Sequence, residues 1–292
     1  MKVAIFGNTF RQEVIEQTKK VIDILQQNNQ VEILLDAQLY TNYSAVNSLS
    51  EQVQSLSEEN TMDINMAFSI GGDGTFLKTA AYITDKNIPI VGINCGRLGF
   101  LADVTNNEIE TAINAIFSKR YKIEERTLLQ LTTNDNSGEG LPFALNEIAI
   151  LKQDLSSMIS IDTLINNEYI LTYQSDGLIL STPTGSTAYS MSVGGPILVP
   201  QANNFIIAPV ASHSLNVRPL VIPDHWEVKL KIKSRSKSYL VSIDGRSQVF
   251  DQDTELLIHK APYTIKIVKP TGHTFFGTLK NKLFWGADKR NS

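Results

Sequence analysis

The stretch Ser69–Ala80, SIGGDGTFLKTA, constrains the fold most strongly, because a strand-like run enters a glycine-rich turn that a helix follows. The apolar residues of Met66–Ile70 fit a buried strand, and those of Phe76–Ile83 fit a helix. A strand, a glycine turn and a helix N-terminus together form a site for phosphate oxygens, because backbone amides converge there. The turn also contains a carboxylate, Asp73, although the usual ligand of such a loop is itself an anion.

The first third of the chain alternates between strand and helix patterns. Lys2–Phe6, Val31–Leu35 and Ile88–Ile93 are further short apolar runs, and apolar residues recur at helical spacing between Val14 and Leu25. This alternation predicts an α/β domain with a parallel sheet. Ligands of such sheets bind at the carboxyl ends of the strands, which is the edge where the glycine turn begins.

The pattern changes after Arg126, where short apolar runs follow one another between turn signals such as Asp244-Gly245. Many short strands with few helices predict a β-rich, sandwich-like domain. We therefore expect an α/β domain over 1–125, a β-rich domain over 126–271 and a tail over 272–292. The tail has too many apolar residues to remain in water, so we expect it to pack back on the first domain: Phe275, Phe276, Leu279, Leu283, Phe284 and Trp285.

Composition excludes several classes of protein. The 292 residues carry a net charge of −4, so no basic field recruits nucleic acid. No stretch approaches the ~18 consecutive apolar residues of a membrane span. The single cysteine, Cys95, excludes a disulfide and a thiolate metal site within one chain, and the four histidines (His213, His225, His259 and His273) lack metal-ligand spacing. We expect a cytoplasmic protein with neither nucleic-acid nor membrane partners.

Two further stretches have the polar character of a binding site. Asn146-Glu147 lies in an apolar, strand-like run, where solvated residues of an edge strand are the alternative interpretation. Ser181–Ser192 holds hydroxyl groups that suit ribose hydroxyls, amides and phosphate oxygens. A low-complexity linker is the alternative there, but the apolar flanks of the stretch argue against it. For Asp73 the alternative is a cap on the helix that starts near Thr75.

Taken together, these motifs resemble the NAD kinase family. The matching stretches follow the family's order over most of the chain: Gly71–Thr75, Gly92–Asn94 with Gly96, Leu98–Phe100, Asn146-Glu147, Asp176–Ser192 with Gly194–Pro196, and His213–Ile222. The glycine–aspartate loop alone is also similar to the loops of diacylglycerol-type lipid kinases and of 6-phosphofructokinases. The run from Asp176 to Ser192 is the specific part of the resemblance.

The resemblance implies transfer of the γ-phosphate of ATP to the 2′-hydroxyl of the adenosine ribose of NAD, which gives NADP. It implies an α/β N-terminal domain, a β-rich NAD-binding domain, and Mg²⁺ or another divalent cation carried with ATP. It also implies a homodimer or homotetramer. No metal would be held by protein side chains alone, although Asp73 could reach the hydrated metal through water.

The resemblance also implies roles for particular residues. Asp73 would be the proton acceptor, because a carboxylate within hydrogen-bond reach of a ribose hydroxyl can take its proton during attack. The remaining residues would bind NAD: Gly74, Asn146, Glu147, Asp176, Thr187, Ala188, Tyr189, Ser190, Met191 and Ser192, in addition to Asp73 itself. Lys78, Ser157, Gln174 and Arg246 are further candidates for contacts to the ligands.

The last three of these further candidates depart from the family pattern. Gln174 stands where relatives often have a basic residue, Ser157 where they often have a basic residue or His, and Arg246 where many have Gln. A guanidinium at Arg246 could instead meet a phosphate.

Other functions remain open from the sequence. A lipid kinase would use the same glycine loop, but would lack the hydroxyl-rich run and would need an apolar entrance. A phosphofructokinase would offer a second acidic motif and basic ligands for a sugar phosphate. A non-catalytic NAD-binding regulator would keep the pocket without turnover.

Overall fold

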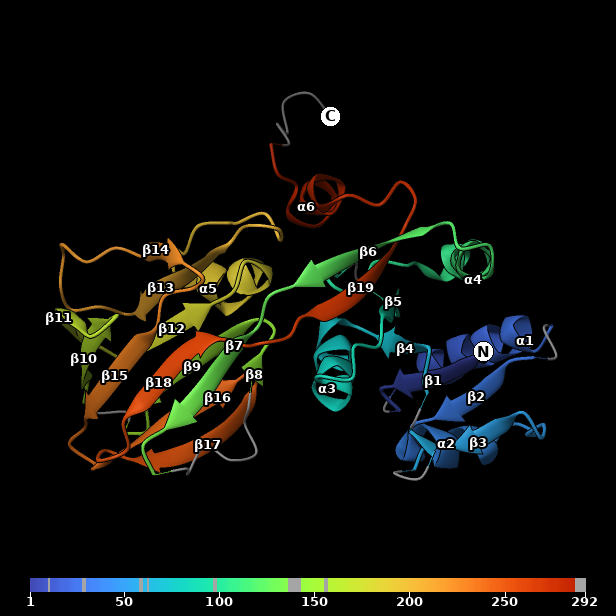
Figure 1. Cartoon of the computed structure of the whole chain (residues 1–292), viewed down its shortest axis with the longest axis horizontal. Coiled ribbons are helices and arrows are strands. Elements are labelled where there is room, and N and C mark those ends of the chain that lie inside the picture. The colour runs from blue at the N-terminus through green and yellow to red at the C-terminus, as the bar shows by residue number, and fades with distance from the viewer. Residues whose placement is uncertain are drawn as a thin grey trace. The chain divides into compact units, whose positions relative to one another are not determined.

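The computed structural model describes residues 1–9, 11–27, 30–57, 60–61, 63–96, 99–135, 143–154 and 157–286. The chain divides into two compact units, one made of residues 1–125 together with the chain from Ile265 onward, and one made of Arg126–Thr264 (Figure 1). The first unit is α/β and the second is built almost entirely of strands, which confirms the predicted fold class.

The first unit contains a seven-stranded sheet in the order β3-β2-β1-β4-β5-β19-β6. The pairs β2–β3, β1–β2, β1–β4, β4–β5 and β5–β19 are parallel. The strand order reverses between β1 and β4, which is the point where ligands bind in sheets of this type. The strands are β1 (Lys2–Gly7), β2 (Glu32–Leu35), β3 (Val53–Ser55), β4 (Met66–Gly71), β5 (Ile90–Asn94), β6 (Tyr121–Arg126) and β19 (Ile265–Pro270).

Helices lie on both faces of this sheet (Figure 1). Side chains of α1, α2 and α4 share one buried cluster with alternate residues of the strands, such as Ile5 and Phe68. Phe76 of α3 instead packs at Gly92, where an added Cβ would lie 3.0 Å from the ring. The helices are α1 (Gln12–Gln26), α2 (Ala37–Ser44), α3 (Asp73–Ile83), α4 (Ile109–Phe117) after the 3₁₀ turn η2 (Asn106–Glu108), and α6 (Phe275–Leu283).

The second unit consists of two six-stranded antiparallel sheets. One runs in the order β11-β10-β15-β18-β7-β8, and the other in the order β14-β13-β12-β9-β16-β17. Residues of both sheets form one buried cluster, as expected for a sandwich. The first sheet contains β7 (Leu129–Thr133), β8 (Phe143–Ala144), β10 (Ile159–Ile165), β11 (Glu168–Ser175), β15 (Val228–Lys233) and β18 (Leu256–Lys260).

The second sheet of this unit carries the polar motifs. Its strands are β9 (Glu147–Lys152), β12 (Gly177–Ser181), β13 (Asn204–Val210), β14 (Leu220–Pro223), β16 (Ser238–Ile243) and β17 (Arg246–Asp251). Two short turns follow β12, namely η3 (Thr184–Thr187) and the one-turn helix α5 (Tyr189–Ser192).

The expected division of the chain differs from the structure at one strand. The sequence-based boundary assigned β19 to the β-rich domain, whereas β19 pairs with β5 in the sheet of the first unit. Its alternating pattern resembles that of the preceding strands. The local sequence of a strand does not indicate which sheet the strand joins. The tail that follows forms α6, with Leu279 buried and Phe276, Phe284 and Trp285 exposed. Residues 287–292 of the tail lie outside the described residues.

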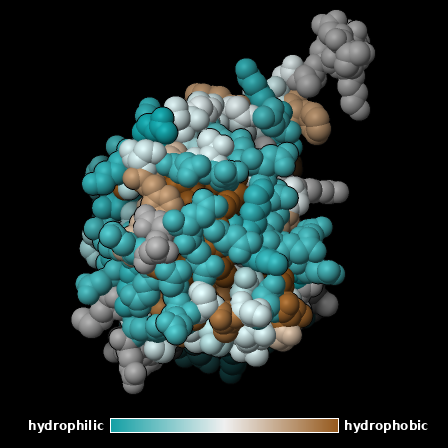
Figure 2. All heavy atoms as spheres, turned by 90° about the vertical axis from the view of Figure 1, so that its right-hand side faces the viewer, coloured by the Kyte–Doolittle hydropathy of each residue, from teal (hydrophilic) through white to brown (hydrophobic). Residues whose placement is uncertain are grey.

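Figure 2 shows one face of the molecule, on which hydrophilic side chains predominate and hydrophobic atoms form only narrow bands between them. None of the described helices is long and apolar enough to cross a membrane.

Candidate functional site

The glycine turn between β4 and α3 is closed on one side and open on the other. An added Cβ at Gly71 would lie 2.3 Å from Thr75 Oγ1, and one at Gly99 would lie 2.1 Å from Asp73 Oδ1. Cβ atoms at Gly72 and Gly74 would meet nothing within 4 Å. Gly71 of the turn and Gly99 of the loop after β5 therefore permit close packing, while Gly72 and Gly74 of the turn leave the backbone accessible to a ligand.

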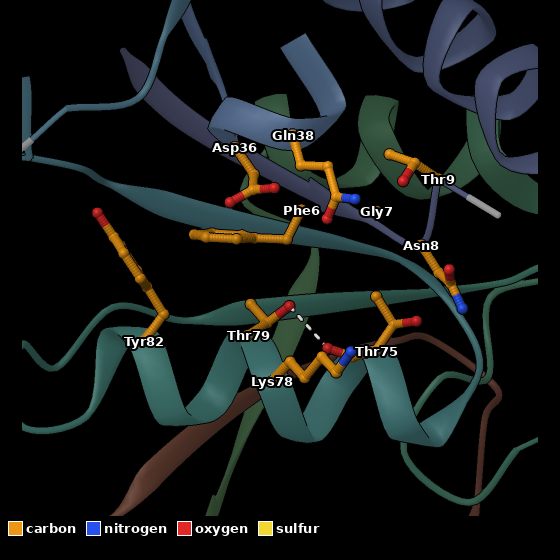
Figure 3. Close-up of a pocket in the computed structure, with 10 residues that line it drawn as sticks. All are labelled: Phe6, Gly7, Asn8, Thr9, Asp36, Gln38, Thr75, Lys78, Thr79 and Tyr82. Carbon is orange, nitrogen blue, oxygen red and sulfur yellow. Dashed lines mark hydrogen bonds between the residues drawn. The ribbon is translucent and has the colours of Figure 1, made fainter. Parts of the chain in front are cut away.

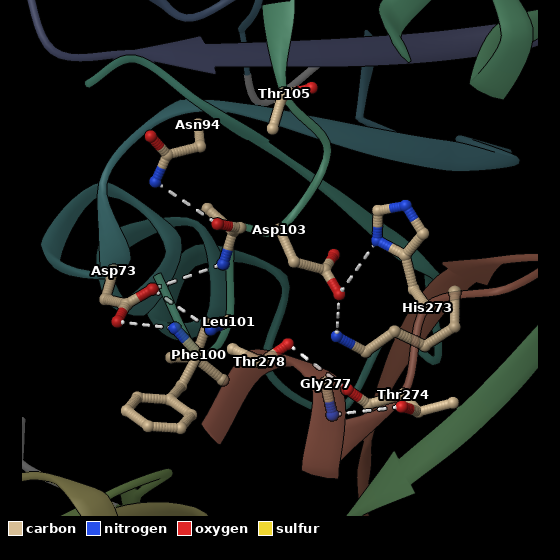
Figure 4. Close-up of polar contacts among 12 residues, drawn as sticks. Asp73, Asn94, Phe100, Leu101, Asp103, Thr105, His273, Thr274, Gly277 and Thr278 are labelled. Carbon is tan, nitrogen blue, oxygen red and sulfur yellow. Dashed lines mark hydrogen bonds and ion pairs between the residues drawn. The ribbon is translucent and has the colours of Figure 1, made fainter. Parts of the chain in front are cut away.

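Asp73 is the first residue of α3, and its carboxylate accepts hydrogen bonds from a distant loop. Oδ2 accepts from the Phe100 amide at 3.0 Å, and Oδ1 accepts from the amides of Leu101 and Ala102 at 3.0 and 3.2 Å (Figure 4). Lys282 Nζ of α6 lies 3.3 Å from Oδ2. The helix itself has Gly72 as its N-cap and no side-chain cap. Asp73 therefore does not serve as the helix cap that was the alternative interpretation.

The loop that donates these amides is itself fixed. Asn94 Nδ2 donates to the Ala102 carbonyl at 3.2 Å, and the Gly99 amide donates to the same carbonyl at 3.3 Å. The neighbouring residue Asp103 is buried and pairs with Lys269 Nζ at 2.6 Å. The carboxylate of Asp73 is thus held by a loop that is tied to β5 and β19. Leu98, part of the motif in the sequence, lies outside the described residues.

His273 links the same loop to the start of α6. Its Nδ1 lies 3.5 Å from Asp103 Oδ2, and its Nε2 lies 3.1 Å from Glu108 Oε1. The hydrogen bond to Asp103 raises the pKa of His273, although burial alone would lower it. Burial alone would raise the pKa of Asp103, but His273 and Lys269 hold it below its ordinary value. The loop, β19 and α6 therefore form one network of charges.

Two adjoining cavities lie at the carboxyl ends of β1, β2 and β4. One of about 290 Å³ is lined by the open glycines Gly72 and Gly74 and by the cations Arg11 and Lys78. The other, of about 230 Å³, is drawn in Figure 3, and its lining comes from β1, the start of α2 and α3: Phe6, Gly7, Asn8, Thr9, Asp36, Gln38, Thr75, Lys78, Thr79 and Tyr82. Asn8, Thr75 and Lys78 line both cavities. Cations, open backbone and an aromatic pair are thus grouped at the strand-order reversal.

The second unit holds a carboxylate in a similar cradle. Asp244 Oδ2 accepts from the Leu145 amide at 2.7 Å, and Oδ1 accepts from the amides of Asn146 and Glu147 at 2.8 and 3.1 Å. Asp244 has φ +49° and Gly245 has φ +81°, as the tight hairpin between β16 and β17 requires. The hairpin was expected from Asp244-Gly245, but its carboxylate fixes the backbone of Asn146-Glu147, and sequence reasoning missed this role.

Asn146 and Glu147 are the polar pair at the start of β9. Asn146 is buried, and one carboxylate oxygen of Glu147, Oε2, is buried without a hydrogen-bond partner among the described residues. The pKa of Glu147 is raised to about 7, chiefly by burial and also by the charge of Asp244, and a hydrogen bond from the Tyr189 amide opposes both effects. The edge-strand alternative does not fit, because β9 pairs with β12 on one side and β16 on the other.

The hydroxyl-rich run packs on this pair through its first half. Thr182 Oγ1 donates to the Leu145 carbonyl at 2.6 Å, and Ser181 Oγ donates to the Asn146 carbonyl at 3.3 Å. Ser186 Oγ donates to the Pro183 carbonyl at 2.7 Å and accepts from the Leu198 amide at 3.0 Å. These hydroxyls make hydrogen bonds within the fold. The segment is therefore ordered and is not the low-complexity linker that was the alternative interpretation.

The second half of the run is more open. Tyr189 and Ser192 are exposed, and Thr187, Ala188 and Met191 are partly exposed. Ser190 is buried, and its Oγ has no hydrogen-bond partner in the described part of the chain. The side chains available to a ligand therefore begin at Thr187.

The remaining candidates have partners of their own. Asp176 pairs with Lys152 Nζ at 2.7 Å, a cation that sequence reasoning did not single out. Ser157 lies 3.4 Å from Asp154 Oδ2, and Gln174 Oε1 accepts from Ser160 at 2.9 Å.

Arg246 donates to the Phe143 carbonyl at 2.9 Å and to the Ile243 carbonyl at 3.3 Å. Ile243 belongs to the same hairpin as Asp244, so the guanidinium of Arg246 links this hairpin to the backbone at Phe143.

No group of three or more His, Cys, Asp or Glu side chains that could hold a metal occurs among the described residues. Asp73 also has both oxygens occupied by backbone amides.

An open glycine loop with a cradled carboxylate defines the site of a protein that handles phosphorylated nucleotides. Family models match both parts of the chain: the ATP-NAD kinase N-terminal domain over residues 3–121 and the ATP-NAD kinase C-terminal domain over residues 145–270. An NAD kinase of Bacteroides fragilis is 50% identical over 290 residues, covering 99% of this chain and 100% of the relative. One of Christiangramia forsetii is 42% identical over 295 residues and covers all of both chains.

Solved structures agree with these matches. An NAD kinase from Archaeoglobus fulgidus in complex with ATP superposes with a TM-score of 0.76 at 25% identity, over 97% of this chain and 99% of that one. Yeast NADH kinase complexed with NADH has the same fold, with a TM-score of 0.90 at 22% identity, over 100% of this chain and 89% of that one. The chain belongs to the NAD kinase family.

Proposed function

We propose that this chain carries out the reaction of its family, the ATP-dependent phosphorylation of NAD to NADP. The 2′-oxygen of the adenosine ribose forms a bond to the γ-phosphorus of ATP. The bond from that phosphorus to the β,γ-bridging oxygen breaks, and ADP leaves with the electron pair. The proton of the ribose hydroxyl passes to the carboxylate of Asp73, so atoms and charges balance.

The observation that carries this proposal is the position of Asp73 beside an open glycine loop. Three backbone amides from Phe100–Ala102 fix its carboxylate, and Gly72 and Gly74 present unobstructed backbone next to it. A ribose hydroxyl is a weak nucleophile, and a fixed carboxylate that accepts its proton lowers the barrier to attack. An acid in a phosphate loop is thus explained by its role toward the hydroxyl rather than toward the phosphate.

The donor is MgATP, with its phosphates on the glycine loop. Arg11 and Lys78 line the cavity that contains Gly72 and Gly74, and they supply positive charge for the triphosphate. The adjoining cavity, with Phe6 and Tyr82 as aromatic walls and Asp36 as an acceptor, suits an adenosine (Figure 3). Mg²⁺ enters with the nucleotide as part of the substrate and offsets its charge.

The acceptor is NAD, held by the second unit. Asn146 and Glu147 bind the adenosine part, and the raised pKa of Glu147 lets its carboxyl group donate or accept a hydrogen bond near neutral pH. Asp176 contacts NAD, and the accessible end of the hydroxyl-rich run lines the pocket with Thr187, Ala188, Tyr189, Met191 and Ser192. Gly74 contributes backbone, while Ser190 supports the pocket from inside.

Further properties of the family belong to the same proposal. We infer a homodimer or homotetramer, a cytoplasmic location and a functional division of the chain near residue 125. The exposed and partly exposed residues between Thr187 and Ser192 support a binding surface in the second unit.

A coupled assay for NADP with purified protein tests the proposal. NADP should form only when NAD and MgATP are both present, and EDTA should stop its formation. A non-catalytic NAD-binding regulator would bind NAD without turnover. A diacylglycerol-type lipid kinase would instead consume ATP with diacylglycerol vesicles as the acceptor, and either result would replace the proposal.

A further inference from the structure

The C-terminal helix α6 contributes a charge to the carboxylate proposed as the proton acceptor. Lys282 Nζ lies 3.3 Å from Asp73 Oδ2 and 4.6 Å from the centroid of the Phe100 ring. Both side chains of the ion pair are about one-third exposed, at 31% for Lys282 and 30% for Asp73. From the sequence, the tail was expected only to pack on the first domain. The motifs therefore do not explain the contact between Lys282 and Asp73.

The donors around Asp73 are of two kinds. The amides of Phe100, Leu101 and Ala102 belong to a backbone tied to two strands, so they cannot withdraw. The ammonium of Lys282 is carried by a flexible four-carbon stem and can move without a change in the backbone. Among the donors that the described chain gives Asp73, Lys282 is therefore the one that an incoming hydroxyl can displace.

The two oxygens of the carboxylate differ in the same way. Oδ1 accepts two fixed amides, whereas Oδ2 accepts one fixed amide and the ammonium. A carboxylate oxygen has about two lone-pair positions, so the second position on Oδ2 is the place where an acceptor hydroxyl can bind. Lys282 occupies that position in the present structure.

The helix that carries Lys282 is anchored to the loop that cradles Asp73. His273, just before α6, lies 3.5 Å from Asp103 (Figure 4). It also contacts Glu108, and Lys269 pairs with Asp103 at 2.6 Å. The Phe275 ring lies 6.3 Å from that of Phe100. Thr274 caps the helix by accepting from the Gly277 amide at 3.1 Å. These contacts restrict Lys282 to the neighbourhood of Asp73.

We propose that Lys282 is a cation of the phosphoryl-transfer site: it holds the acceptor position on Asp73 Oδ2 until the ribose hydroxyl of NAD takes that position, and it then faces the transferring phosphoryl group. The inference rests on the proposed function, because it assigns the moved ammonium to the phosphoryl oxygens. Negative charge on those oxygens is stabilised during transfer by fixed or nearby cations. Lys282 would thereby place the C-terminal helix in the reaction.

The alternative is that Lys282 merely complements the helix dipole, as lysines in the last turn of a helix do. Lys280 provides the matched control, because it lies in the same last turn, carries the same charge and is exposed. The variants Lys282→Met and Lys280→Met change the net charge equally. Lys282→Arg keeps a cation at the position, and Lys282→Gln gives a second neutral variant should methionine impair folding.

The experiment measures kcat, the KM for NAD and the melting temperature of the full chain with saturating MgATP. Lys282→Met and Lys282→Gln should lower kcat by about 10²-fold with the KM for NAD within about twofold, because a charge that acts on the transferring group is lost. Lys280→Met should stay within about twofold of wild type, and Lys282→Arg should restore most of the rate. Melting temperatures should be similar for all folded variants.

Wild-type kcat in both neutral variants would overturn the proposal, as would an equal loss in Lys280→Met. The turnover of the unmodified chain, measured alongside, shows whether the proposed function or only the role of Lys282 has failed. If the unmodified chain forms NADP but Lys282 variants match it, only the role of Lys282 is wrong. If the unmodified chain forms no NADP, the proposed function fails and the role of Lys282 falls with it.

Discussion

The two units each hold one aspartate in a cradle of three successive backbone amides, yet the surroundings of the two carboxylates are opposite. Asp73 accepts from Phe100, Leu101 and Ala102, and a lysine ammonium and an open glycine loop lie next to it. Asp244 accepts from Leu145, Asn146 and Glu147, and its burial raises its pKa despite these bonds.

The comparison shows that the cradle alone does not make a catalytic group. Backbone amides fix a carboxylate in either unit, because each buried amide needs an acceptor. The two carboxylates differ in their other neighbours: Asp73 has a movable cation and space for a ligand beside it, whereas Asp244 is buried near the charges of Glu147 and of Arg246, whose guanidinium donates to backbone carbonyls. We therefore expect Asp73 to act on substrate and Asp244 to hold the backbone of the NAD-binding pair.

Asp73→Asn should have the largest effect. Asparagine keeps the size of the side chain but cannot act as the proton acceptor, so kcat should fall roughly 10²–10⁴-fold. NAD binding should largely survive, because most of its proposed contacts lie in the second unit. Steady-state kinetics and calorimetric titration of NAD on a variant that melts normally measure both quantities. Turnover near the wild-type rate would return Asp73 to a purely structural role.

Asn146→Ala should weaken the binding of NAD and not the transfer step. Loss of hydrogen bonds to NAD costs about 0.5–3 kcal/mol, which corresponds to a rise in the KM for NAD of roughly 2- to 150-fold. The KM for ATP should change little, because the proposed ATP cavity is lined by residues of the first unit. An unchanged KM for NAD would remove the pair from the site.

Asp244→Asn tests whether the second cradle is structural. An amide offers one acceptor oxygen and sets an NH₂ group against a backbone amide, so the free energy of unfolding should fall by about 2–3 kcal/mol. Denaturant unfolding followed by circular dichroism measures this loss. For the molecules that remain folded, kcat should decline far less than in Asp73→Asn. If Asp244→Asn left the stability intact and abolished kcat, Asp244 would have a catalytic role and not a structural one.

Features that depend on neighbouring residues could be predicted from the sequence, whereas contacts between distant residues could not. The alternating sheet and the sandwich follow from apolar periodicity, and the glycine loop follows from its spacing. The cradles left no such signal, because amides donate whatever the side chain is and the partners lie 27–29 residues from Asp73 and 97–99 from Asp244. The sequence likewise did not indicate the contact of Lys282 with Asp73, because the two residues are 209 positions apart.

The tail illustrates the same limit. Its aromatic residues were expected to be packed, and Leu279 is indeed buried, but Phe276 and Trp285 are 61% and 57% exposed in the single chain. Amphipathic spacing indicates that a segment has an apolar side, yet it does not say how much of that side the rest of the chain covers.

Glu147→Gln should have the smallest effect and should depend on pH. The folded-state pKa of Glu147 is raised to about 7, chiefly by burial, so its neutral form is favoured in the folded protein. The corresponding stability is fully present below the ordinary pKa near 4.3 and is lost as pH rises through about 7. Glutamine removes this loss. The variant should gain about 1–2 kcal/mol relative to wild type between pH 5 and pH 8, after allowance for partial exposure.

Melting curves across that pH range measure the difference between Glu147→Gln and wild type. A difference that does not change with pH would show that Glu147 titrates in the ordinary range and that the carboxylate of Asp244 does not influence it.

The most direct test of the account is the identity of the atom that receives the phosphate. We predict that the chain with MgATP converts NAD to a product phosphorylated at the 2′-hydroxyl of the adenosine ribose, as read by phosphorus NMR. An NAD analogue with 2′-deoxyadenosine should bind and compete with NAD but accept no phosphate, because the nucleophile facing Asp73 is missing. Transfer of label from γ-labelled ATP to the 2′-deoxy analogue, or a product phosphorylated elsewhere on NAD, would contradict the account.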